Sequence, residues 1–370
     1  MTSLKIDAIH LLTVGADAMA REGAVDKAFR LYEIANNLRL VMRGEAPFSE
    51  WGDLYTGAER DPIIINDALW PIRSLPRRAE CATRLIKPDT HSPAFKVIGR
   101  DALAIKAGVR FDGHLFADDT LAPLEALEPG ADYAVHVEDG VVSVSRAVTI
   151  PSGQFLLGGF HYAPGGRGSS ACAGGDAIPA ISPDSVWDIA FRPSCPDPRG
   201  MTLVTGPTCD FWCDIYLTGV NHLVDGTSRF GVTIADGADR PRDAAGAAVK
   251  TFDYAAASAA MAAHGKTLLS HDECLAAAFG VKENSAASRN PKVTGLDAER
   301  TSKFGLMQAT GNLWIWGHDG NPDSPRASLF GGSWINGDSA GSRTADVGSW
   351  PGHSRYNVGA RGRSDPLKPV

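Results

Sequence analysis

The sequence lacks the features that mark several common classes of protein. No run of about 18 apolar residues is present, so we expect no membrane span. There is no basic tract and the net charge is -7, which argues against binding to nucleic acid or to an anionic membrane surface. The N-terminus lacks the basic start and apolar centre of a signal peptide, so we expect synthesis in the cytoplasm and release by lysis or inside a larger particle.

Cysteine is sparse, and its spacing does not indicate a metal site. None of the six cysteines forms a CxxC pair, and no histidines follow at zinc-finger spacing. We therefore interpret them as buried or indifferent thiols in a reducing compartment. The six positions are Cys81, Cys172, Cys195, Cys209, Cys213 and Cys274.

Catalytic motifs are also missing. The chain has no HExxH and no P-loop. His161, His222, His264 and His271 have no matching carboxylate at metal-ligand spacing, so we assign them core or surface roles. We expect a protein that is not an enzyme and needs no cofactor.

The 370 residues are 44% hydrophobic and 21% charged, as in an ordinary soluble globular protein of two or three domains. Helical spacing of apolar residues over 26–43 predicts a helix in a partly helical region, 1–92, which we expect to serve attachment or assembly. From about 93 to 150 the chain alternates polar and apolar residues between tight turns at Asp112-Gly113 and Asp139-Gly140, which predicts a small β-sandwich.

The rest, 151–370, mixes short apolar runs with two predicted helices. An alanine-rich helix is expected over 253–263. A second is expected over 270–280, where Ser270 and Glu273 have capping-box spacing and Gly280 ends the pattern. The fold class that these patterns indicate is α+β.

The stretch from 329 to 365 has the composition of a linker but carries large residues at intervals that a linker does not need. Its sequence is LFGGSWINGDSAGSRTADVGSWPGHSRYNVGARGRSD. If its pieces are extended, a period of two places Ser333 and Ile335 opposite Trp334, and His353 and Arg355 opposite Tyr356. One face would be pinned to a core and the other displayed. The alternative is a solvated glycine-rich loop with chance alternation.

The segments GNLWIWG, LFGGSW, GSR and the terminal GARG resemble the end of the C-type-lectin-fold domain shared by formylglycine-generating enzymes and the variable proteins of diversity-generating retroelements. GGFHYAPG, VWDIAFRP and DIYLTGVNHLVDGTSRFGVTIADG are also similar to the receptor-binding members found at phage tail-fibre tips. The resemblance runs from about Ala94 to the end. It implies a C-type lectin fold at 151–370, preceded by the small β-sandwich. The first 90 residues do not resemble the strand-rich N-terminal region of those proteins.

The resemblance also implies which positions vary. In the family a reverse transcriptase mutates adenines while it copies a template repeat, and AAC codons are the usual targets. A codon that keeps its final C while its first two bases vary cannot encode Lys, Glu, Gln, Met or Trp. None of these five residues occurs at the matching positions. The variable, ligand-binding face at 333–358 would then comprise Ser333, Ile335, Asn336, Gly337, Ser339, Asp346, Gly348, Ser349, His353, Arg355, Asn357 and Val358.

Other positions would support this face. Trp334 is expected to anchor beneath it, and Arg343 and Arg361 to tie loops through fork-shaped hydrogen bonds. The family often has Trp where Val347 stands and Cys where Ser364 stands. A hypothesis for the first departure is that Trp350 packs in its place.

We therefore expect a receptor-binding protein whose C-terminal face is diversified by a retroelement and attaches a phage to its host. Its partners would be a host cell-surface protein or other macromolecular receptor, two further copies in a homotrimer, and a tail-fibre or other particle component bound through 1–92. Its location would be the virion, at a tail-fibre tip, or a bacterial cell surface.

The alternatives are a host-encoded diversified surface protein, a formylglycine-generating oxidase and a calcium-dependent sugar lectin. The oxidase needs paired reactive cysteines near the C-terminus, and none follows Cys274. The sugar lectin needs an EPN, QPD or WND calcium-site motif, and the sequence contains none of the three. Whether a structural calcium ion is bound is left open.

Overall fold

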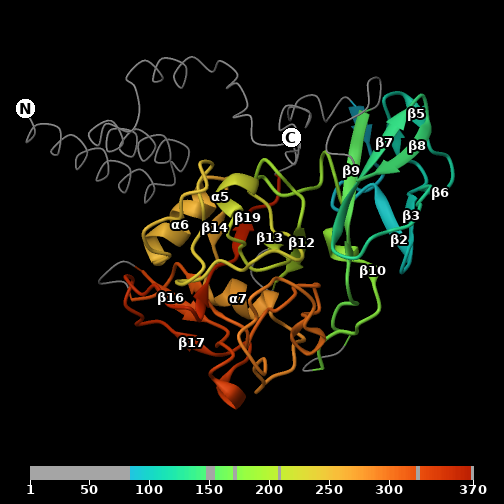
Figure 1. Ribbon diagram of the computed structural model, residues 1–370. Coiled ribbons are helices and arrows are strands. Elements are labelled where there is room, and N and C mark those ends of the chain that lie inside the picture. Colours follow the sequence, from blue (N-terminus) through green and yellow to red (C-terminus); the bar gives the residue numbers. More distant parts are fainter. Residues whose placement is uncertain (1–83, 147–154, 170–172, 207–209, 322–325, 368–370) are drawn as a thin grey trace, which may run out of the picture. The chain divides into compact units, whose positions relative to one another are not determined.

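The computed structural model describes residues 84–146, 155–169, 173–206, 210–321 and 326–367. The helix expected over 26–43, and nearly all of the expected region 1–92, lie outside these residues. Among the described residues no helix is long and apolar enough to cross a membrane. Figure 1 shows two groups of strands, with the helices gathered in the C-terminal group.

The first group is a β-sandwich around one apolar core. Its strands are β1 (Leu85–Ile86), β2 (Phe95–Gly99), β3 (Ala102–Ile105), β4 (Arg110–Phe111), β5 (His114–Leu115), β6 (Thr120–Leu121), β7 (Ala131–Glu138), β8 (Val141–Ser145), β9 (Phe155–Ala163), β10 (Ala180–Ile181) and β11 (Trp187–Asp188), with the 3-10 turn η3 (Pro183–Ser185) before β11. They form sheets of order β1-β4-β5, β2-β3-β6 and β10-β9-β7-β8, and β11 also pairs with β9. Buried residues such as Phe95, Ile105, Val135 and Phe160 share the core between the sheets.

Local turn chemistry closes the hairpins where the sequence predicts them. Asp112 and Gly113 have φ of 46° and 85° between β4 and β5, and Asp139 and Gly140 have φ of 48° and 81° between β7 and β8. Two consecutive positive φ values are the geometry of a type I′ turn, so both predicted turns are confirmed. The sheet continues past the expected boundary at 150, because β9 pairs with β7 from Ala131↔Tyr162 to Val137↔Phe155.

The C-terminal group consists of short strands and three α-helices. Its elements are β12 (Met201–Thr205), β13 (Asp210–Asp214), α5 (His222–Asp225), α6 (Tyr254–Ala262), β14 (Thr267–Leu268), α7 (His271–Ala277), η4 (Ala298–Arg300), β15 (Trp314–Gly317), β16 (Ser328–Phe330), η5 (Gly337–Ser339), β17 (Ala345–Asp346), β18 (Val358–Gly359) and β19 (Gly362–Ser364). Helix α7 begins as predicted: the Ser270 side chain accepts from the Glu273 amide, and the Glu273 carboxylate accepts from the Ser270 amide.

Two four-stranded sheets organise this group, with orders β12-β13-β19-β14 and β17-β16-β15-β18. Strand β19, near the C-terminus, lies between β13 and β14. Strand β18 pairs in parallel with β15. The chain on both sides of the stretch that carries the predicted face is therefore fixed in a sheet.

Candidate functional site

Two loops carry all of the predicted variable positions except Asp346 in β17 and Val358 in β18. We call residues 331–344, between β16 and β17, the first loop, and residues 347–357, between β17 and β18, the second loop. The loops meet: Asn357 Nδ2 donates to Ser333 Oγ over 3.4 Å, and the Trp334 and Tyr356 ring centroids are 6.3 Å apart. We call their joint surface the displayed face.

The first loop is a turn and not an extended strand, so the period of two predicted there is wrong. The Asn336 amide donates to the Ser333 carbonyl over 2.9 Å. The Asn336 side-chain oxygen accepts from the Ser333 amide at 2.9 Å and from Ser333 Oγ at 2.8 Å. Gly337, at φ 55°, then starts η5. An asparagine side chain that bonds to the nearby backbone favours such turns over extended chain.

Residues outside the variable set hold the first loop. The Glu283 carboxylate accepts from the Ser342 amide at 2.9 Å and also from Ser342 Oγ. At Gly341 a Cβ would lie 2.2 Å from Glu283 Oε2, so the chain passes this carboxylate too closely for a side chain. The Trp334 amide donates to the Asn312 carbonyl over 3.0 Å.

The second loop is held against a different part of the scaffold. The Phe252 amide donates to Ser354 Oγ over 2.9 Å, and the Tyr254 amide donates to the Pro351 carbonyl over 3.0 Å. The Gly237 amide donates to the Arg355 carbonyl over 2.9 Å. A Cβ at Gly237 would lie 2.3 Å from the Arg355 nitrogen, so only glycine fits this contact.

The twelve predicted variable positions differ in exposure. Exposed positions are Ile335, Gly337, Ser339, Asp346, Gly348 and Arg355. Half-buried positions are Asn336, His353 and Asn357. Buried positions are Ser333, Ser349 and Val358. Most of the set is therefore accessible. Of the buried members, Ser333 lies where the loops meet, Val358 pairs in the sheet, and Ser349 contacts His353 of its own loop.

The three predicted supporting residues have different surroundings. Arg361 is fully buried and donates to the carbonyls of Asp214 and Ile215, each at 2.7 Å, and of Met307 and Gln308, at 2.7 and 3.3 Å. Trp334 is half-buried.

Arg343 needs a correction, because its side chain is exposed and makes no loop-tying hydrogen bond to any residue that the structure describes. It lies two residues before β17, with its side chain open to solvent. The packing hypothesis for Trp350 is wrong as well, since its side chain is 65% exposed.

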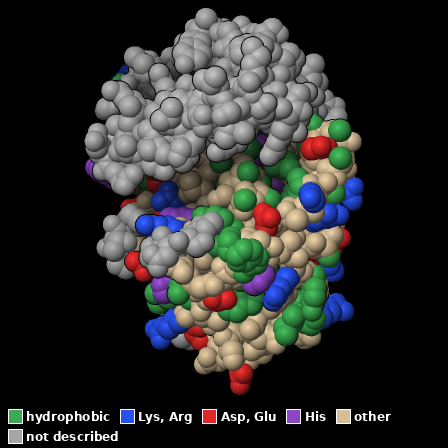
Figure 2. Space-filling model, turned by 90° about the vertical axis from the view of Figure 1, so that its left-hand side faces the viewer, with side chains coloured by type: hydrophobic (Ala, Val, Ile, Leu, Met, Phe, Trp, Pro, Cys, Tyr) green, Lys and Arg blue, Asp and Glu red, His purple; other side chains and the backbone are tan. Residues whose placement is uncertain are grey.

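Apolar side chains outside the predicted set also reach the surface here. Val347, Trp350 and Tyr356 are each more than half exposed, as is Ile335. The view in Figure 2 shows hydrophobic side chains beside histidine and basic side chains on one side of the molecule. Sequence reasoning assigned Tyr356 to the pinned side. The exposure of Tyr356 could have been suspected from the sequence, because a large aromatic residue stands out in a segment otherwise rich in Gly and Ser.

A chain of polar side chains runs along the second loop. Arg355 Nη2 lies 3.3 Å from His353 Nε2, and His353 Nδ1 lies 3.3 Å from Ser349 Oγ. Partial burial and the neighbouring Arg355 cation lower the pKa of His353 below its usual value. This shift favours the neutral imidazole at pH 7.

The described part of the chain shows neither a cluster of metal ligands nor a reactive thiol. No three His, Cys, Asp or Glu side chains are grouped there so that they could hold a metal ion. Cys195, Cys213 and Cys274 are buried free thiols. Burial raises the pKa to about 11 for Cys195 and to about 12 for Cys213, so both remain protonated and unreactive at neutral pH.

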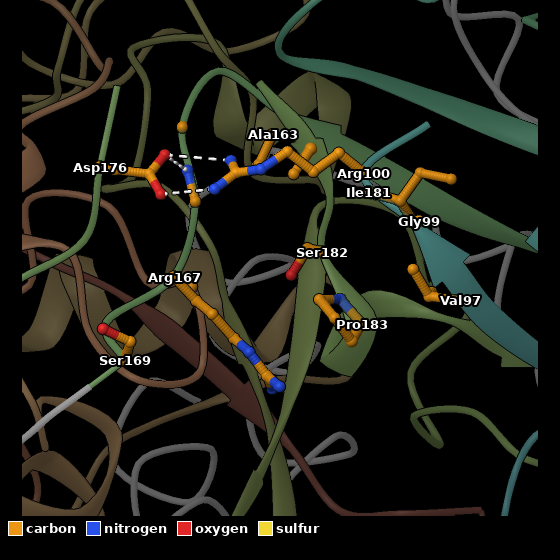
Figure 3. Close-up of a pocket in the computed structure, with 14 residues that line it drawn as sticks. Val97, Gly99, Arg100, Ala163, Arg167, Ser169, Asp176, Ile181, Ser182 and Pro183 are labelled. Carbon is orange, nitrogen blue, oxygen red and sulfur yellow. Dashed lines mark hydrogen bonds and ion pairs between the residues drawn. The ribbon is translucent and has the colours of Figure 1, made fainter. Parts of the chain in front are cut away.

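A hollow of about 260 Å³ lies away from the two loops, between β2, β9 and β10 (Figure 3). Arg100 binds both oxygens of Asp176 at its edge, at 3.1 and 2.8 Å, and donates to the Ile178 carbonyl over 2.9 Å. The hydrogen bond from Arg100 lowers the pKa of Asp176 to about 2. These charged groups satisfy each other, so we assign the pair a structural role in holding the 176–178 segment.

This geometry defines a class of protein: a lectin-like domain of mixed strands and helices that displays two neighbouring C-terminal loops. A family model described as the Mtd second domain matches residues 93–188. The tail fiber receptor-binding protein of Bordetella phage BPP-1 is 39% identical over 362 residues, a match that covers 85% of this chain and 93% of that protein.

Solved structures of the major tropism determinant are similar as well. The P3c and I1 variants are 37% identical to this chain, with TM-scores of 0.73 and 0.72, and each match covers 79% of this chain and 88% of that one. The chain therefore belongs to the family of phage tail-fibre receptor-binding proteins that includes the major tropism determinant. The expected α+β class and C-type lectin fold are confirmed.

Proposed function

We propose that this chain binds a receptor on the surface of a bacterial host through the displayed face, and so attaches a phage particle to that host. The relatives support this proposal, because they are named as receptor-binding and tropism-determining proteins of a tail fibre and not as enzymes. On this proposal the protein is located in the virion.

One observation carries the proposal: the contacts that attach the two loops to the rest of the domain come from backbone groups and from residues outside the variable set. Glu283 and Ser342 hold the first loop, while Phe252 and Ser354 hold the second. Exposed positions such as Ile335 can then change without loss of the scaffold. A rigid framework with adaptable outward side chains is how loop-borne recognition surfaces achieve specificity.

Diversification by a retroelement is the second part of the proposal. A near-copy of codons 329–365 should lie in the neighbouring DNA, with adenines at the codons of the twelve predicted positions and a reverse transcriptase gene beside it. A neighbourhood without such a repeat would contradict diversification but leave receptor binding intact.

Assembly is the third part. We propose a homotrimer, attached to a tail-fibre or other particle component through residues 1–92. Several copies on one particle would raise the overall binding strength by about 10²–10⁴ when their faces engage together. Light scattering on the full chain measures the copy number directly.

The receptor-binding test compares two surface substitutions in the full chain. Ile335→Asp places a charge on the displayed face, whereas Leu121→Asp changes a similarly exposed apolar residue of the sandwich. We expect the first variant alone to lose binding to host cells, with both melting as the wild type does. Equal binding of the two variants would contradict the proposal. A chelator should leave wild-type binding unchanged, since we propose no calcium-dependent contact with the receptor.

A further inference from the structure

Arg355 is a displayed cation with no acidic partner among the described residues. Its guanidinium has one hydrogen-bonding contact there, with His353 Nε2 at 3.3 Å. Scaffold arginines behave differently: Arg300 binds Asp297 at 2.9 Å, and Arg363 binds Glu273 at 2.6 Å. The charge and the remaining N–H groups of Arg355 are therefore available to a ligand.

The neighbouring imidazole gives this cation one hydrogen bond within the second loop. Arginine only donates, so His353 Nε2 must accept from it, and the ring proton must lie on Nδ1. That N–H is directed at Ser349 Oγ, 3.3 Å away. The backbone of Arg355 is itself held by the Gly237 amide. A cation positioned in this way loses little conformational freedom when it binds.

Other side chains of the displayed face favour a protein ligand over a glycan. Ile335, Val347 and Trp350 are exposed at 52%, 53% and 65%. Ile335 and Val347 offer no hydrogen bonds, so they suit apolar side chains and not the hydroxyl-rich surface of a sugar. Aromatic and arginine side chains together are the usual energetic centre of a protein interface.

From these observations we infer that Arg355 receives the carboxylate of an Asp or Glu side chain that lies beside apolar residues on a protein receptor. The guanidinium fork matches a carboxylate with two parallel N–H···O bonds. His353 is a positioning residue, since it orients Arg355 and does not itself need to contact the receptor. The inference rests on the proposed receptor-binding function.

The experiment selects random disulfide-closed peptides, displayed on filamentous phage, for binding to the full chain. We expect enriched peptides to carry Asp or Glu, and their affinity to fall about tenfold or more in Arg355→Gln. Arg110→Gln is the control, because it removes an exposed arginine of β4 that lies outside both loops, and affinity should stay within about twofold. His353→Phe should weaken binding, and His353→Gln, which keeps an acceptor, should restore part of it.

Three outcomes would overturn the inference: enriched peptides without acidic residues, equal affinity for Arg355→Gln and the wild type, or no enriched peptide at all. Binding of polygalacturonate that depends on Arg355, without peptide binding, would overturn the assignment to a protein ligand. The proposed function is tested separately through Ile335→Asp on host cells. If Ile335→Asp loses binding to host cells while Arg355→Gln keeps its affinity for the peptides, only the carboxylate assignment fails.

Discussion

Arg361 offers a quantitative test of what holds the lectin-like domain together. Its side chain is 1% exposed and donates four hydrogen bonds, to carbonyls of residues 214, 215, 307 and 308. These bonds join β18 and β19 to the end of β13 and to the segment before β15. Arg361→Met keeps most of the side-chain volume but removes every donor.

The expected loss follows from two opposing effects. Hydrogen bonds that involve a charged group stabilise by about 1.5–3 kcal/mol each, so the three short bonds are worth about 4.5–9 kcal/mol. Burial of the guanidinium opposes this, and it lowers the pKa of Arg361. The substitution removes that cost, but it takes one donor from each of four buried carbonyls, of which only that of Ile215 is shown to keep another donor, the Met307 amide. We expect a net loss of about 4 kcal/mol, which is a large part of the stability of a typical domain.

The assay is urea unfolding followed by tryptophan fluorescence, at one fixed protein concentration because oligomers gain stability by mass action. Arg343→Met is the control, since Arg343 is exposed, and its free energy of unfolding should stay within about 0.5 kcal/mol of the wild type. A loss below about 1 kcal/mol for Arg361→Met would refute the argument from buried hydrogen bonds.

Three further predictions concern the two loops and the buried histidine. Glu283→Ala removes both bonds to Ser342, so the Ser342 amide should exchange with deuterium at least about tenfold faster, and unchanged exchange would contradict the contact. Gly237→Ala brings a Cβ to 2.3 Å from the Arg355 nitrogen, so the second loop should shift and cell binding should fall; full binding would show that the loop adapts. Burial lowers the pKa of His222 well below the ordinary 6.5, so the folded chain keeps it neutral while the unfolded chain protonates it. The free energy of unfolding should therefore be constant above about pH 7.5 and fall below about pH 6.5, by up to about 1.4 kcal/mol per pH unit from this group. His222→Phe should flatten that slope, and an unchanged slope would assign the loss to other groups.

Local chemistry made part of the fold predictable. The turns at Asp112-Gly113 and Asp139-Gly140, and the capping box of Ser270 and Glu273, each depend on residues within four positions. Such signals act before any tertiary contact forms, so the sequence alone carries them.

The arrangement of the displayed face was less predictable. Arg343 and Arg361 both stand in glycine-rich surroundings, yet one is exposed and the other is buried by carbonyls from residues more than 50 positions away. Only the tertiary fold distinguishes them. Likewise, the Asn336 side chain turns the first loop where an alternating pattern suggested a strand. Half of the twelve predicted variable positions are nevertheless exposed. The family resemblance identified these positions independently of their backbone conformation.

The central claim is that the displayed face binds the receptor while the scaffold fixes its shape. The most direct measurement is host-cell binding by a full-length variant in which Ile335, Ser339, Asp346 and Arg355, all exposed, are replaced together by alanine. The account predicts that binding is lost while the melting temperature stays within about 2 °C of the wild type. Retained binding at an unchanged melting temperature would contradict it.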